Sequence, residues 1–443
     1  MNYLIRNANI VNESKITAGD VLISEGKIAA IGSGIEAIDA EVIDATGLWL
    51  MPGVIDDQVH FREPGLTHKG EIYTEAKAAV AGGVTSFMEQ PNTAPPATTV
   101  ERLEEKYARA AEVSLANYSF FIGTTNNNLD ELLKINPRNV AGVKIFLGSS
   151  TGDMLVDNEE QLNNVFAKVK TLIAVHAEDD PMIKRNVEEY RAKYGDDMPA
   201  DYHGLIRSRE ACYASSSKAI ARAKKFGTRL HVFHISTADE LELFDNSVPL
   251  REKKITAEVC IHHLWFSDAD YKTKGNFIKW NPSVKTANDR EALWKALLDN
   301  RIDVIATDHA PHTIEEKQQS YLKAPSGGPL VQHSLVAMLE KAREGKISVE
   351  RVVEKMCHAP ADLFRIDKRG YIREGYWADL VLVHPQQHWT VAKDNLLYKC
   401  GWSPLEGTVF HSRVVSTFVN GNLVYNNGAI NELYKGMRLE FNV

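Results

Sequence analysis

The middle of the chain alternates short apolar runs with longer amphipathic stretches. Eight apolar runs have the length of buried strands, at residues 53–55, 84–88, 118–123, 143–147, 172–175, 230–233, 255–259 and 302–307. Segments with helical periodicity separate or follow them, at residues 71–81, 100–113, 158–170, 208–226, 238–246, 290–300 and 332–344. Eight strands that alternate with helices predict an α/β fold, the (β/α)8 TIM barrel. A doubly wound open sheet is the structural alternative, but no GxGxxG sequence follows any of the runs.

Both ends of the chain carry short apolar runs between glycine and asparagine turns, which is typical of antiparallel β-structure. These runs lie at residues 3–5, 20–23 and 27–31, and again at 378–383 and 416–425. Asn420-Gly421-Asn422 interrupts the last run with the sequence of a tight hairpin turn. We therefore predict a small β-sandwich domain formed from both termini, residues 1–50 plus 364–443. The barrel would then occupy residues 51–363.

Composition and charge are those of an ordinary globular protein and argue against several classes of partner. A chain of 443 residues can hold one α/β barrel and a small additional domain. Its net charge of −8 gives no electrostatic reason to bind nucleic acid or an anionic membrane, so an anionic ligand would need locally placed cations. The cysteines form no CxxC pair and indicate reduced, buried thiols: Cys212, Cys260, Cys357 and Cys400. With no signal peptide and no long apolar run, we expect a soluble cytoplasmic protein.

Chemically active side chains lie in the predicted strands or at their carboxyl ends, where barrels of this type build their active sites. In chain order they are Gln58, His60, Arg62, Asn92, Lys144, His176, His234 and Asp308. A single histidine at a strand end is usually structural, but three of them with an aspartate favour a metal site. Alternate side chains of a strand point the same way, so we expect Asp56, Gln58 and His60 to share one face.

Lys144 lies inside an apolar strand, where burial disfavours an ammonium group and lowers its pKa. A neutral amine in this position can react with carbon dioxide to form a carbamate, an anion able to bridge two metal ions. A salt-bridged lysine in the core is the alternative. We expect the remaining histidines of the barrel to be structural. His309 would lie behind the site, and His231, His262 and His263 would support the fold.

Several short motifs run from the first barrel strand to the C-terminal part of the chain. They are HFREPG at 60–65, Pro91-Asn92, VKIF at 143–146, VHAE at 175–178, HVFHIS at 231–236, TDHAPHT at 307–313 and GYIREGYWADLVL at 370–382. With these motifs the sequence resembles the amidohydrolase superfamily, and within it the dihydroorotases. The resemblance implies a (β/α)8 barrel with a β-sandwich built from both termini. It also implies a metal-dependent, reversible hydrolysis of dihydroorotate to N-carbamoyl-L-aspartate, whose reverse closes the ring in de novo pyrimidine biosynthesis.

The resemblance also implies roles for individual residues. It implies metal binding by His60, Lys144, His176, His234 and Asp308, with one or two Zn²⁺ per subunit and a carboxylated Lys144. It implies contacts with the substrate by Arg62, Asn92, Asn281, His312, Ser326 and Gly327. Asp308 is implied as the catalytic residue that moves a proton during ring opening. Some members of the superfamily bridge their metals with an aspartate after the fourth strand, and Asp153 would be the candidate here.

One position departs from the pattern of the superfamily. Its metal site begins with His-x-His, whereas this chain has Gln58-Val59-His60. Gln58 could ligate weakly through its amide oxygen, the site could hold only the metal bound by His176 and His234, or the protein could be inactive. Because the other site residues are intact, we expect a working enzyme with an altered metal site.

Two alternatives remain open. A dihydropyrimidinase, hydantoinase or allantoinase would use the same scaffold, but a substrate without a carboxylate gives Arg62, Asn92 and His312 no common role. A noncatalytic pseudo-dihydroorotase would serve as a scaffold for aspartate transcarbamoylase. The resemblance implies a small-molecule substrate and a homodimer, with no nucleic-acid or membrane partner.

Overall fold

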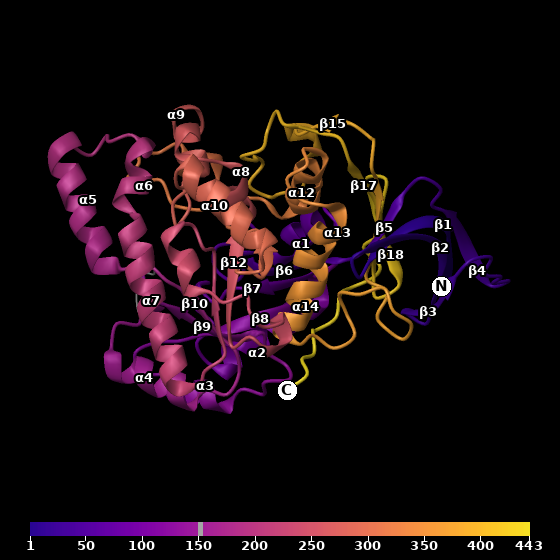
Figure 1. The fold of residues 1–443 in the computed structure, drawn as a ribbon, viewed down its shortest axis with the longest axis horizontal. Coiled ribbons are helices and arrows are strands. Elements are labelled where there is room, and N and C mark those ends of the chain that lie inside the picture. Colours follow the sequence, from indigo (N-terminus) through magenta and orange to yellow (C-terminus); the bar gives the residue numbers. More distant parts are fainter. Residues whose placement is uncertain (149–153) are drawn as a thin grey trace.

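A parallel β-barrel covered by helices forms the larger part of the molecule, and a strand-rich part lies at one end of it (Figure 1). The computed structural model describes residues 1–148 and 154–443. Within them, eight parallel barrel strands neighbour one another in sequence order. They are β6 (Val54–Val59), β7 (Val84–Glu89), β8 (Asn117–Gly123), β9 (Gly142–Phe146), β10 (Ile173–His176), β11 (Leu230–Val232), β12 (Ile255–Cys260) and β13 (Val304–Ala306). A parallel bridge between Val59 and His309 nearly closes the sheet, so the predicted barrel is confirmed.

Helices connect successive strands and cover the outside of the barrel (Figure 1). They are α1 (Ile72–Ala81), α2 (Val100–Val113), α3 (Leu129–Lys134), α4 (Glu159–Lys168), α5 (Asp180–Tyr194), α6 (His203–Ile206), α7 (Arg209–Phe226), α8 (Ile261–Trp265), α9 (Tyr271–Lys274), α10 (Ala287–Leu298), α11 (Ile314–Lys317), α12 (Ser334–Arg343), α13 (Val349–Val353) and α14 (Ala359–Phe364). Helix α2 illustrates how the sequence forms these helices: the Thr99 side chain caps its N-terminus, and Leu103, Tyr107 and Ala110 form its buried face.

Two helical regions differ from the sequence prediction. The expected helix at 238–246 is only a short 3₁₀ segment, Asp239–Leu243. The buried Glu240 carboxylate accepts hydrogen bonds from Ser216 and Thr237, which fixes this segment as a tight turn against α7. The second difference is α5, which periodicity did not reveal because Ile183 is its one fully buried residue.

The strand-rich part is a nine-stranded sheet that takes strands from both ends of the chain. Its strands are β1 (Asn2–Asn12), β2 (Lys15–Ser24), β3 (Lys27–Gly32), β4 (Ala40–Asp44), β5 (Trp49–Pro52), β14 (Leu380–His384), β17 (Arg413–Val419), β18 (Asn422–Asn426) and β19 (Ala429–Ile430). The two ends meet where β5 pairs with β14. The predicted hairpin is present between β17 and β18, with positive φ at Asn420 (50°) and Gly421 (75°). Contrary to the purely antiparallel expectation, β4 and β5 run parallel to β1.

A buried polar network joins the barrel to the strand-rich part. Asn117 of β8 donates to Asp379, 3.2 Å away, and Asp379 also pairs with Arg369.

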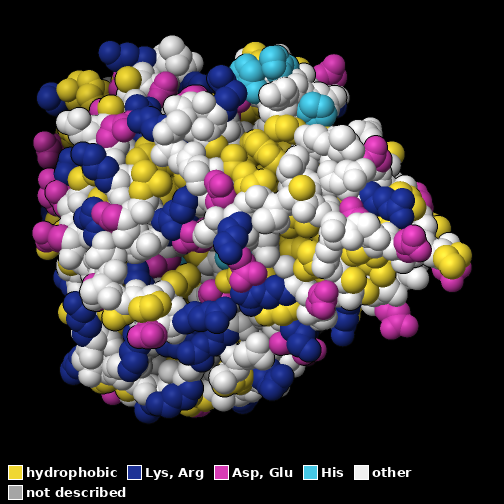
Figure 2. Space-filling model, turned by 45° about the vertical axis from the view of Figure 1, so that its right-hand side comes forward, with side chains coloured by type: hydrophobic (Ala, Val, Ile, Leu, Met, Phe, Trp, Pro, Cys, Tyr) yellow, Lys and Arg dark blue, Asp and Glu magenta, His cyan; other side chains and the backbone are white. Residues whose placement is uncertain are grey.

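A further small pairing joins β15 (Trp389–Thr390) to β16 (Val409–Phe410). No helix in the described residues is long and apolar enough to cross a membrane. On the face shown in Figure 2, basic and acidic side chains both lie among polar and apolar ones.

Candidate active site

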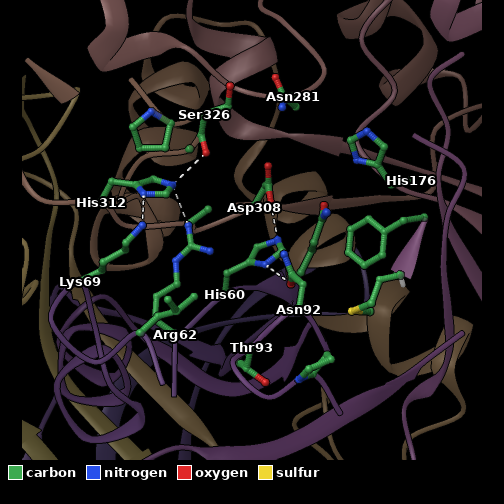
Figure 3. A pocket seen from close by; sticks show the side chains of 18 of the residues that line it. His60, Arg62, Lys69, Asn92, Thr93, His176, Asn281, Asp308, His312 and Ser326 are labelled. Carbon is green, nitrogen blue, oxygen red and sulfur yellow. Dashed lines mark hydrogen bonds and ion pairs between the residues drawn. The ribbon is translucent and has the colours of Figure 1, made fainter. Parts of the chain in front are cut away.

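A cavity of about 820 Å³ opens at the carboxyl ends of the barrel strands. It is lined by every residue within the described ranges to which the sequence assigned a metal or substrate role: His60, Arg62, Asn92, Lys144, His176, His234, Asn281, Asp308, His312, Ser326 and Gly327. Figure 3 shows the labelled members of this set, among them His60, His176 and Asp308, around the cavity. Asp153, the alternative bridging residue, lies outside the described residues.

The first strand contradicts the expected alternation of side chains. Asp56 pairs with Phe87 and Val59 with Glu89, so β6 holds one residue more than β7 over this span, which is a β-bulge. Gln58 and His60 line the cavity as predicted. Asp56 does not share their face; its carboxylate accepts a 2.6 Å hydrogen bond from the hydroxyl of Thr307.

His60 is held in the form that a metal ligand needs. Its Nδ1 lies 2.8 Å from Oδ1 of Asn92, an amide oxygen that can only accept, so Nδ1 carries the ring proton. Nε2 is then free to present its lone pair beside Oδ1 of Asp308, 3.1 Å away. Burial lowers the pKa of His60, although Asp308 opposes this. The ring is therefore neutral at pH 7.

His176 and His234 face each other across 2.9 Å, from Nδ1 of the first to Nε2 of the second. The Nε2–H of His176 donates a hydrogen bond to the Glu178 carboxylate at 2.7 Å. This leaves the lone pair on Nδ1, which faces His234. Burial opposes ionisation of Glu178, but Arg207 and His176 together lower the pKa of its carboxyl. Burial also lowers the pKa of both histidines, so two neutral imidazoles point at one another.

Lys144 stands between aromatic rings in the barrel interior. Its Nζ lies 4.0 Å from the ring centre of Phe233 and 4.8 Å from that of Phe146. No carboxylate of the described residues is within ion-pair distance, so the salt-bridged alternative has no support from the geometry. Burial lowers the pKa of Lys144 to about 7, so a large fraction of the amine is neutral at physiological pH.

The opposite side of the cavity is cationic. Nε of Arg62 donates to the Pro311 carbonyl at 3.0 Å, and its Nη2 lies 3.0 Å from Nε2 of His312. Lys69 approaches His312 from the other side, with Nζ 3.0 Å from Nδ1 (Figure 3). Burial lowers the pKa of Arg62 to about 10, which leaves it charged at pH 7. Lys69 was missed in the sequence, although its position shortly after the HFREPG motif was a usable signal.

Three of the cavity residues have left-handed backbone conformations. The φ angles are 71° at Arg62, 40° at His234 and 47° at Asp308. Such conformations cost a non-glycine residue of the order of 1 kcal/mol or more, and they gather at functional sites where the surrounding structure enforces them. Each residue follows the end of a barrel strand, where the turn aims its side chain into the cavity.

The family follows from comparison with known proteins. The model of the amidohydrolase family matches residues 49–424. Dihydroorotases from Methanosarcina acetivorans and Halobacterium salinarum are 34% and 36% identical to this chain, covering 96% and 88% of it and 92% and 89% of their own lengths. The L-hydantoinase of Arthrobacter aurescens superimposes with a TM-score of 0.92 at 28% identity, covering 97% of each chain. This chain belongs to the amidohydrolase family.

The donor set of this amidohydrolase fits a metal ion at two places. His176 and His234 bring two ring nitrogens to one point, Nδ1 of the first and Nε2 of the second. His60 and Asp308 offer a nitrogen and an oxygen close to each other. These are atoms that Zn²⁺ and related cations bind.

Gln58 makes the position beside His60 and Asp308 the weaker of the two candidate metal sites. Its side-chain oxygen lies 3.6 Å from Sγ of Cys260 and accepts from that thiol. Burial raises the pKa of the Cys260 thiol well above its usual range, so the sulfur keeps its proton. The site therefore has an amide and a protonated thiol where the superfamily pattern has an imidazole.

The other histidines of the amidohydrolase barrel do not line the cavity. His309 donates to Glu75 at 2.7 Å and accepts from the backbone N–H of Leu330, behind Asp308. His262 stacks on Trp280, with ring centres 4.3 Å apart, and His263 lies beside the Pro282 carbonyl. These contacts agree with the supporting roles expected from the sequence.

Proposed function

We propose that this protein is a dihydroorotase, which hydrolyses dihydroorotate reversibly to N-carbamoyl-L-aspartate. The observation that carries the proposal is the cationic side of the cavity. Arg62 and His312 present donors to the same region, and Asn92 lines it too. A guanidinium can grip a carboxylate with two N–H groups, and an amide or imidazole N–H can complete the binding. A ring that carries a carboxylate satisfies this arrangement.

The tautomer of His312 supports this assignment. The ammonium group of Lys69 can only donate, so its contact with Nδ1 of His312 favours the ring proton on Nε2. Nη2 of Arg62 is also a donor, so in this tautomer its 3.0 Å approach to Nε2 is a contact and not a hydrogen bond. In this tautomer the Nε2–H donates to the Ser326 carbonyl at 2.9 Å. Burial lowers the pKa of His312 well below its usual range, so the ring remains a neutral donor.

The proposed cofactor is Zn²⁺, one or two ions per subunit. His176 and His234 would hold one ion, and His60, Asp308 and a carboxylated Lys144 would hold the other or share it. The neutral amine of Lys144 would form the carbamate by attacking carbon dioxide and releasing a proton. When bound, the metal polarises the scissile ring carbonyl and lowers the pKa of the water that attacks it.

Asp308 is the proposed proton carrier. Its carboxylate projects into the cavity beside His60, only 6% exposed. It would take the proton from the attacking water and deliver it to the ring nitrogen that leaves, acting as base and then acid. Asn281 would contact the ring, and the backbone at Ser326 and Gly327 would border it.

The competing proposal is a hydantoinase or dihydropyrimidinase, because the L-hydantoinase of Arthrobacter aurescens and the dihydropyrimidinase of Brevibacillus agri share the fold. Hydrolysis of dihydroorotate, dihydrouracil, hydantoin and allantoin by zinc-loaded protein separates the two. We expect turnover of dihydroorotate to exceed that of the neutral rings by at least about 100-fold, the value of a buried charge pair of roughly 3 kcal/mol. Preference for a neutral ring would refute the dihydroorotase assignment.

A noncatalytic scaffold is the other competing proposal. Failure to hydrolyse any of these rings after loading with zinc and bicarbonate, together with tight binding of aspartate transcarbamoylase, would establish it. For the active enzyme we propose a homodimer, which sedimentation of the purified protein tests directly.

A further inference from the structure

Beneath the cavity, three ionisable side chains from separate barrel strands meet in the interior. Asp57 comes from β6, His231 from β11 and Glu258 from β12, and all three are fully buried. One ligand atom from each lies within 4.8 Å of the others. The bulge in β6 makes this possible, because Asp57 and Gln58 follow each other and yet both face inward.

The atoms that face the centre of this cluster have no hydrogen-bond partner among the described residues. They are both carboxylate oxygens of Asp57, Oε2 of Glu258 and Nε2 of His231. Nε2 lies 3.3 Å from Oδ2 of Asp57 and 3.8 Å from Oε2 of Glu258, within ion-pair range but not in hydrogen-bond geometry. Buried polar atoms are nearly always hydrogen-bonded, so several unpartnered atoms directed at one point indicate a position that can bind a ligand.

The outward-facing atoms of the same side chains are satisfied. Nδ1 of His231 lies 2.9 Å from the hydroxyl of Thr256, which itself donates to the Leu230 carbonyl. The hydroxyl therefore accepts from Nδ1–H, and a neutral His231 turns the lone pair of Nε2 into the cluster. A ring N–H fixed in this way is the usual support of a histidine that binds metal. Oε1 of Glu258 accepts from the backbone N–H of His234 at 2.9 Å.

The spacing suits a cation coordinated between the three groups. Zinc bonds of about 2.0–2.2 Å in tetrahedral geometry place neighbouring ligand atoms roughly 3.4 Å apart. The distances of 3.3 and 3.8 Å around Nε2 bracket this value. One imidazole and two carboxylates form a donor set used for Zn²⁺ and related divalent ions.

The charges of the three side chains also favour a bound cation. Two ionised carboxylates against one imidazolium would leave a net negative charge in the barrel core, which is expensive, and burial together with Asp57 raises the pKa of Glu258 to about 7. A divalent cation with a neutral imidazole balances both carboxylates. The rival occupant is a proton: burial alone would lower the pKa of His231, but Asp57 and Glu258 raise it to about 9.

The cluster is separate from the cavity. Asp57, His231 and Glu258 do not line it. The thiol of Cys260 stands between, 3.3 Å from Oε1 of Glu258 and 3.6 Å from the side-chain oxygen of Gln58. We propose that Asp57, His231 and Glu258 bind a divalent transition-metal cation such as Zn²⁺, which ties β6 to β11 and β12 beneath the active site.

The test is a crystal of the full-length protein loaded with Zn²⁺, with anomalous data on both sides of the zinc absorption edge. We expect a peak between Nε2 of His231 and the two carboxylates, apart from any peak near His176. A map with peaks only in the cavity would overturn the proposal and leave His231 as a protonated partner of the two acids.

Metal content gives an independent measurement that does not depend on activity. Asp57→Asn and His231→Gln should each lose about one equivalent of zinc per chain while the cavity retains its own. His333→Gln is the matched control, because His333 is equally buried but lies between the hydroxyls of Tyr398 and Ser403. Unchanged zinc content in folded Asp57→Asn or His231→Gln protein would refute the proposal. If neither variant folds, the wild-type map decides.

Discussion

Nζ of Lys69 lies 3.0 Å from Nδ1 of His312, on the side of the imidazole away from the Arg62 guanidinium. The same ammonium group pairs with Glu316 at 3.0 Å, so it is fixed in place. Lys69 thus acts on the proposed substrate carboxylate through His312, as a positioning residue and as a nearby positive charge.

Lys69→Met should raise KM for dihydroorotate about 10- to 100-fold with a smaller change in kcat, because a charge-assisted hydrogen bond of roughly 1.5–3 kcal/mol is removed. Steady-state kinetics on dihydroorotate and dihydrouracil would measure this. Lys77→Met is the control, since Lys77 pairs with Glu432 outside the cavity. Equal losses on both substrates would argue against a role specific to the carboxylate.

Arg62→Lys should weaken dihydroorotate binding by a similar or larger factor, because a lysine cannot reproduce the planar fork of a guanidinium. It would also lose the hydrogen bond from Nε to the Pro311 carbonyl. The matched control is Arg109→Lys, where the arginine pairs with Glu63 and does not line the cavity. Near-normal kinetics of Arg62→Lys would remove the proposed substrate assignment.

Gln58→His should strengthen the metal place beside His60 and Asp308, because an imidazole replaces a weak amide ligand. Titration of apoprotein with Zn²⁺, followed by elemental analysis, should show one more tightly held zinc per chain than in the wild type. Gln161→His, on the outside of the barrel in α4, should leave the zinc content unchanged. A wild type that already holds two tight zinc ions in the cavity would contradict the expectation.

Carbamate formation on Lys144 should depend on pH in a defined direction. The neutral amine reacts with carbon dioxide, and the pKa of Lys144 is lowered to about 7 by burial. Labelling of the apoprotein should therefore increase as pH rises through about 7 and decrease below it. With ¹³C-bicarbonate, a carbamate carbon signal is expected in wild type and absent in Lys144→Met. Lys106→Met is the control, since that buried lysine forms an ion pair with Glu89.

The sequence by itself determined the barrel and the membership of its site. The strands are apolar and short, so their positions follow from hydrophobic runs, and residues at their carboxyl ends must meet at one mouth. That topological rule suffices to bring His60, Lys144, His176, His234 and Asp308 together without any knowledge of distances. The hairpin at Asn420-Gly421 could also be predicted from the local sequence, because its turn needs positive φ angles that few residues other than Asn and Gly adopt.

Only the tertiary structure decided which atoms face one another. The bulge in β6 turns Asp56 toward Thr307 and Asp57 toward His231, and strand alternation could not show it because a bulge depends on pairing with β7. Lys69 and His312 are far apart in sequence, and their contact exists only once the barrel has nearly closed. Hydrophobic periodicity records burial, whereas the direction of a polar side chain is set by partners from distant strands.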